Sequence, residues 1–171
     1  MYQTVSQVID TRSFSSLWFW IVLVVFWSLS SHFVLGVPYD MVIRARRYGG
    51  EADQDLYDMV RVSTNRILYI VNKAAVLLIC VAMFWLSIFV TLAFYYDIEF
   101  AQAMLCFYVP FLIISALSVR AARRIKATDP TGAVLQRRLL FHRLSIQALG
   151  MFFVAGTSLW GIWQNLHEAI F

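Results

Sequence analysis

The sequence predicts an all-α, polytopic membrane protein with four transmembrane helices and helical extensions on the cytoplasmic side. The chain has 171 residues, and 61% of them are hydrophobic. Four stretches contain no Asp, Glu, Lys or Arg, and each is long enough to cross about 30 Å of hydrocarbon as a helix: Ser13–Tyr39, Ala74–Tyr96, Phe100–Val119 and Leu144–Leu166. We therefore expect a single integral membrane domain over 1–171, with spans at about 14–36, 67–96, 100–119 and 144–166 and cytoplasmic segments at 37–66 and 120–143.

The cations predict how these helices are oriented. All fourteen Lys and Arg residues except Arg12 lie between the first and second charge-free stretches or between the third and fourth. Because cytoplasmic loops carry an excess of Lys and Arg, both termini are expected to be periplasmic, in a bacterial inner membrane. The aromatic residues agree with this orientation, since several fall at the expected outer interface, where Trp and Tyr concentrate: Trp18, Trp20, Tyr95, Tyr96, Trp160 and Trp163.

The first helix is expected to begin near Phe14 and to end near Gly36. Pro38 ends it, because proline lacks an N–H donor and restricts the residue before it. A short helix, Met41–Tyr48, follows with Asp40 as its N-cap. Its apolar start and its later arginines suit a segment that lies on the cytoplasmic surface of the membrane.

The second helix is expected to be unusually long. No helix-breaking residue lies between Ala52 and Tyr95, so a cytoplasmic extension of several turns is expected to continue into the second span. Residues 63–65 (Ser-Thr-Asn) are the weakest point, where any kink is expected. The short turn at 96–99 makes the second and third helices antiparallel neighbours. The third helix is expected to kink at Pro110, which a membrane helix tolerates when neighbours satisfy the freed carbonyl.

The fourth helix is expected to run from about Pro130 to about His167, with Asp129 as its N-cap. One of its faces carries small and hydrogen-bonding residues at steps of three and four positions, which lets another helix pack closely. We call this set the small-residue stripe, and it consists of Gln147, Gly150, Val154, Thr157, Gly161 and Gln164. The helix that packs against it belongs either to this chain or to another protein.

Few residues of the sequence could carry chemistry. There is no Ser/His/Asp arrangement and no glycine-rich phosphate loop, so we expect no catalytic residue and no enzyme. Cys80 and Cys106 are isolated, and no metal site is expected. His32 is a weak candidate ligand for haem or pigment, near the same membrane face as His142, but a hydrogen bond between helices is its commoner role. We expect no bound cofactor, and contact with pigment or haem only within a complex.

The basic segments are expected to meet anionic lipids or an acidic partner. The net charge of +4 would suggest nucleic acid in a soluble protein, but membrane topology accounts for it here, so no nucleic-acid binding is expected. Cations that are not on lipid are expected to pair within the chain, with Glu51, Asp53, Asp55 and Asp58. The candidate cations are Arg44, Arg46, Arg47, Lys73, Arg120, Arg123, Arg124, Arg137 and Arg138.

Four strings of the chain carry a family resemblance, and they lie at 13–18 (SFSSLW), 31–40 (SHFVLGVPYD), 65–70 (NRILYI) and 159–165 (LWGIWQN). They resemble a family of small alphaproteobacterial inner-membrane proteins labelled "component of SufBCD complex", and the resemblance covers nearly the whole chain. It implies an association with Fe–S cluster assembly. It also implies a bacterium whose inner membrane holds photosynthetic and respiratory complexes.

These observations favour a non-enzymatic accessory subunit or assembly factor of a larger inner-membrane complex of the photosynthetic or respiratory kind. Its partners would be other integral membrane subunits. One alternative is a membrane anchor or regulator for Fe–S cluster (SufBCD) assembly, which rests on the family label. Another is a small transporter or a haem- or pigment-binding membrane protein, which would rely on His32 and Pro110.

Overall fold

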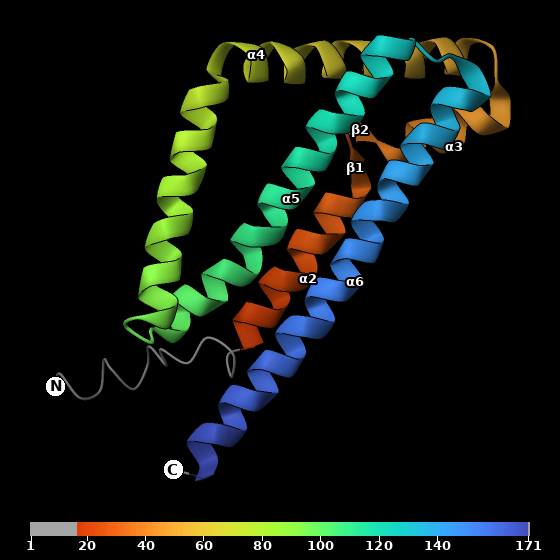
Figure 1. Ribbon diagram of the computed structural model, residues 1–171. Coiled ribbons are helices and arrows are strands. Elements are labelled where there is room, and N and C mark those ends of the chain that lie inside the picture. Colours follow the sequence, from red (N-terminus) through yellow and green to blue (C-terminus); the bar gives the residue numbers. More distant parts are fainter. Residues whose placement is uncertain (1–16, 171) are drawn as a thin grey trace, which may run out of the picture.

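The computed structural model describes residues 17–170. This part of the chain is all-α apart from one small hairpin, which confirms the all-α part of the predicted fold class. The elements follow the order α2 (Leu17–His32), β1 (Phe33–Val34), β2 (Val37–Pro38), α3 (Tyr39–Tyr48), α4 (Glu51–Phe94), α5 (Glu99–Thr128) and α6 (Gly132–Ile170). Figure 1 shows that α2, α5, α6 and the second half of α4 run along the long direction of the molecule. The first half of α4 lies across one end of them.

Three helices, α4, α5 and α6, are long and apolar enough to cross a membrane. The fourth expected span is shorter, because α2 has 16 residues in the described part of the chain. Such a helix is about 24 Å long, less than the roughly 30 Å of a hydrocarbon core. The expected start of this span at 14–16 lies outside the described residues.

The first helix ends at His32, four residues before the expected end at Gly36. There the chain turns back, and Val34 pairs with Val37 in an antiparallel hairpin. The two turn residues, Leu35 and Gly36, have φ angles of 55° and 78°, as two-residue hairpin turns commonly require. This conformation costs a leucine about 1–2 kcal/mol. Leu35 is only 3% exposed, so burial of its side chain offsets that cost.

A bend at Ala74 divides α4 into two halves of different character. Ala74 has φ −122° and ψ 20°, outside the helical region, and the helix changes direction sharply there (Figure 1). The kink expected at residues 63–65 was therefore placed wrongly. Residues 67–73, which the expected second span included, belong to the half that crosses the end of the other helices. Only residues 75–94, which we call the apolar arm, run lengthwise.

The reason for the bend lies in the burial pattern of the first half of α4. Leu56, Val60, Thr64 and Leu68 recur at steps of four residues, and all are buried. Such a stripe holds a helix against a core on one side. After Ala74 the sequence is apolar on every side, so it has no single face to keep against that core.

The buried stripe of α4 belongs to a hydrophobic core at one end of the molecule. This core joins the hairpin, α3, the first half of α4 and the adjoining ends of α5 and α6, and we call these parts together the end layer. Helix α3 contributes Val42 and Ala45 to this core, while Ile43 is exposed, so most of its apolar residues pack within the chain. The buried members are Leu35, Val37, Val42, Ala45, Leu56, Val60, Leu68, Ala122, Ile125, Leu135 and Leu139.

Two of the expected helix caps were wrong. Helix α3 begins at Tyr39, so Asp40 lies in its first turn and makes no capping bond. Helix α6 begins at Gly132, two residues after Pro130. Asp129 instead ends α5 in a left-handed conformation, with φ 39°. Tyr57 of α4 donates a hydrogen bond to Asp129 Oδ1 at 2.9 Å, and this bond raises the pKa of the tyrosine above its ordinary value.

Candidate functional site

The small-residue stripe of α6 faces other helices of the same chain. Gly150, Thr157 and Gly161 are buried, Gln147 and Val154 are half-buried, and the side chain of Gln164 lies outside the described part. A Cβ atom on Gly150 would lie 2.7 Å from Cε3 of Trp27 in α2, which is closer than real side chains come.

A second core explains the burial of the stripe. Phe19 and Leu23 of α2 and Ala103 of α5 form this core, and Val154 of α6 and Cys106 of α5 pack against it. The stripe therefore packs α6 against α2 and α5. Of the two partners left open by the sequence, the helices of this chain occupy it.

The two histidines near the end layer have different surroundings. His32 ends α2 and is exposed. His142 of α6 is 7% exposed, and its Nε2 lies 3.4 Å from the hydroxyl oxygen of Ser118 in α5. His142 is thus a contact between α5 and α6. Sequence reasoning had weighted His32 more heavily, because burial cannot be read from its position in an apolar run.

Most of the candidate cations belong to one of two groups, one on α3 and one around a cleft, and Lys73 and Arg123 belong to neither. The group on α3 consists of Arg44, Arg46 and Arg47, which are exposed. Lys73, directly before the bend of α4, has its Nζ 5.6 Å from the centroid of the Tyr69 ring. Arg123 is exposed on α5 but does not belong to the second group, which surrounds a cleft.

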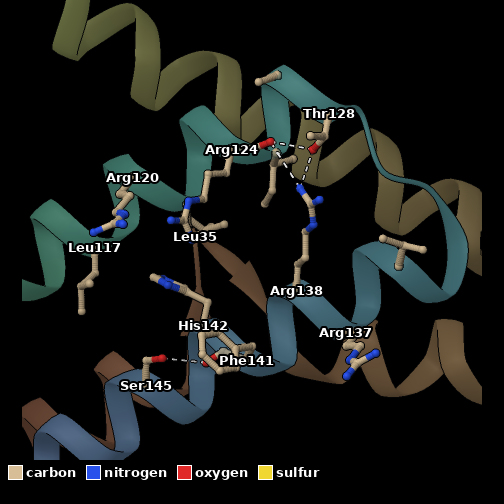
Figure 2. Close-up of a pocket in the computed structure, with 14 residues that line it drawn as sticks. Leu35, Leu117, Arg120, Arg124, Thr128, Arg137, Arg138, Phe141, His142 and Ser145 are labelled. Carbon is tan, nitrogen blue, oxygen red and sulfur yellow. Dashed lines mark hydrogen bonds between the residues drawn. The ribbon is translucent and has the colours of Figure 1, made fainter.

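A cleft of about 840 Å³ lies between α5 and α6, and we call it the arginine cleft. Arg120 and Arg124 line it from α5, and Arg137, Arg138 and His142 line it from α6. Figure 2 shows Arg124 reaching from α5 toward α6, and Arg138 and His142 reaching from α6 toward α5. None of the 14 lining residues is acidic. The cleft therefore gathers positive charge without a carboxylate to balance it.

Hydrogen bonds hold one arginine of the cleft in place. Arg138 donates to the backbone carbonyl of Arg124 at 3.3 Å and to the hydroxyl of Thr128. Asp53, one of the expected partners of the arginines, accepts a hydrogen bond from Gln136 at 2.7 Å.

The cleft spans the boundary between charged and charge-free sequence. In α5 the charge-free stretch ends at Val119, and in α6 the next one begins at Leu144. Leu117 and Ser145 continue the lining inside these charge-free stretches, and Phe141 lines the cleft three residues before the second of them. The cleft thus has a cationic part and a less polar part.

A second surface of interest is the apolar arm of α4. Between Leu68 and Ala93 no residue of α4 is buried by the chain. On one side, Tyr108 of α5 donates a hydrogen bond to the carbonyl of Ala82 at 3.0 Å, and its ring packs edge-to-face on Phe89. The remaining sides expose large apolar side chains, of which Val76, Leu77, Ile79, Met83 and Phe84 are 56–76% exposed.

Sequence reasoning had named the arginines of the cleft individually but had not grouped them. A signal was present, because Arg120 and Arg124 are four residues apart, as are Arg138 and His142. Residues at this spacing share one face of a helix. That these two faces meet depends on how α5 and α6 pack, which no spacing within one helix specifies.

The three long apolar helices indicate a membrane protein. Comparison with protein-family models, with curated proteins and with solved structures finds no match to this chain. Function is therefore inferred from the arginine cleft and the apolar arm.

Proposed function

We propose that this protein is a non-enzymatic accessory subunit or assembly factor of a larger complex in a bacterial inner membrane, of the photosynthetic or respiratory kind. It acts by contact, and its partners are transmembrane helices of other integral membrane subunits. The observation that carries this proposal is the apolar arm of α4, residues 75–94, which has no buried residue before Ala93.

The length and composition of the arm support a partner helix. Twenty helical residues extend about 30 Å, which matches the hydrocarbon thickness. Met83, Phe84 and Trp85 are 46–62% exposed along it, and Met and aromatic residues are enriched where proteins meet. Small residues, such as Cys80, which is exposed, let a second helix approach closely. The arm therefore combines features that suit helix docking.

Photo-crosslinking from Cys80 tests this proposal. A Cys106→Ala variant, labelled in native membranes with a photoreactive maleimide, is expected to give a discrete adduct with one integral membrane protein, identified by mass spectrometry. The matched control removes both cysteines and carries Phe152→Cys. Phe152 is 74% exposed on α6, and both label sites lie about 10 Å into their charge-free stretches. The control is expected to label lipid only. Lipid adducts alone from both positions would contradict a docked partner at the arm.

The proposed orientation places the end layer in the cytoplasm and both termini in the periplasm. It follows from the excess of Lys and Arg in the end layer, against Arg12 alone before the first helix. A phosphatase fused after Phe171 is expected to be active, and a fluorescent protein that folds only in the cytoplasm is expected to be dark at the same position. The reverse pattern would show that the carboxy terminus is cytoplasmic.

A further inference from the structure

We propose that the arginine cleft binds the phosphate headgroup of one anionic phospholipid, from the leaflet next to the end layer. This inference goes beyond the proposed docking function, because it concerns α5 and α6 and not the apolar arm. The juxtaposition that carries it is a group of arginines from two helices above an apolar lining, at the boundary of the charge-free stretches.

The cationic part of the cleft suits a phosphate group. Guanidinium groups are planar donors that bind phosphate oxygens with two parallel hydrogen bonds. Arg120 and Arg124 come from α5, while Arg138 reaches toward them from α6, so donors approach from both sides (Figure 2). No carboxylate lines the cleft to compete with the phosphate. Arg138 is already oriented by its bonds to Thr128 and to the carbonyl of Arg124, which reduces the ordering needed on binding.

The apolar part of the cleft suits a lipid more than a soluble anion. Leu117 of α5 and Phe141 of α6 line it, and Phe141 is 67% exposed. Leu117 lies two residues inside the end of the charge-free stretch of α5, and Phe141 lies three residues before that of α6. A phosphate held by the arginines would therefore sit at headgroup depth, with its acyl chains directed along α5 and α6 toward the hydrocarbon. Inorganic phosphate would leave this apolar lining uncovered.

Removing two arginines of the cleft tests the proposal. The Arg120→Gln/Arg124→Gln variant removes two charges from the cleft. It retains the hydrogen bond that Arg138 donates to residue 124, because the acceptor is the backbone carbonyl. The matched control, Arg44→Gln/Arg47→Gln, removes the same charge from the exposed face of α3. Both variants of the full chain are purified in detergent, and lipid binding is measured by native mass spectrometry.

Phosphatidylglycerol is the anionic probe, and phosphatidylcholine is the probe with the same phosphate but no net charge. The wild-type chain is expected to bind one phosphatidylglycerol in preference to phosphatidylcholine. The cleft variant is expected to bind phosphatidylglycerol about 30-fold more weakly, since each arginine near an anionic surface contributes severalfold to the affinity. The α3 control is expected to change the affinity by less than about threefold.

Inorganic phosphate in large excess distinguishes a lipid site from a site for a soluble anion. It is expected not to displace phosphatidylglycerol from the wild-type chain, and full displacement would overturn the assignment to a lipid. An equal decrease in the affinity for phosphatidylglycerol in the cleft variant and the α3 control would also overturn it. Binding would then depend on the total surface charge and not on the cleft. Arg124→Gln alone, expected to weaken binding about fivefold, provides the same test if the double variant does not fold.

Discussion

Replacing Leu139 with alanine is expected to lower the free energy of unfolding by about 2–5 kcal/mol, the usual cost of a large cavity in a packed core. Leu139 of α6 is fully buried and belongs to the core of the end layer, with Leu56, Val60 and Leu135. Thermal or denaturant unfolding in mild detergent measures the loss. Because this core joins α3, the first half of α4 and the ends of α5 and α6, the whole layer should loosen.

The neighbouring residue supplies the control for this prediction. Leu140 is 38% exposed, so Leu140→Ala removes the same atoms without leaving a cavity in the core. Its free energy of unfolding is expected to fall by about 0.5 kcal/mol or less. Equal losses from both variants would show that the end layer is not a tightly packed core. That result would favour the position predicted for α3 from the sequence, on the cytoplasmic surface of the membrane.

The second large effect is expected at Gly150, where the small-residue stripe of α6 meets α2. Gly150→Ala would place a Cβ atom 2.7 Å from the ring of Trp27. The indole ring must shift, and overpacking of this kind costs about 1–3 kcal/mol. A lower midpoint of thermal unfolding in detergent is the expected result, with weaker packing of α2 against α6.

Gly156 provides the matched comparison in the same helix. A Cβ atom there meets nothing within 4 Å, and alanine favours a helix by about 1 kcal/mol over glycine. Gly156→Ala is therefore expected to be neutral or slightly stabilising. A lower unfolding midpoint for Gly150→Ala, with an unchanged or higher midpoint for Gly156→Ala, would support the packing of α6 on α2. An equal decrease in both variants would contradict it.

The sequence by itself determined the long apolar helices and their order. Hydropathy specifies α4, α5 and α6 because an apolar run of this length has few other stable forms in lipid. The absence of helix-breaking residues between Ala52 and Tyr95 also specifies the unusual length of α4. The spacing of Gly150, Val154 and Thr157 also determined which face of α6 is buried, since residues at steps of three and four share one side of a helix. These features depend on local sequence alone.

Only the tertiary structure decided the bend at Ala74, the core of the end layer and the arginine cleft. Ala74 is an ordinary helix former, and the chain bends there because the residues before it pack on one face while those after it are apolar all round. Asp129 could have capped α6, but it closes α5 with Tyr57 as its partner. Arg124 and Arg138 meet because α5 and α6 pack together, and the relative placement of two helices depends on contacts between residues far apart in sequence.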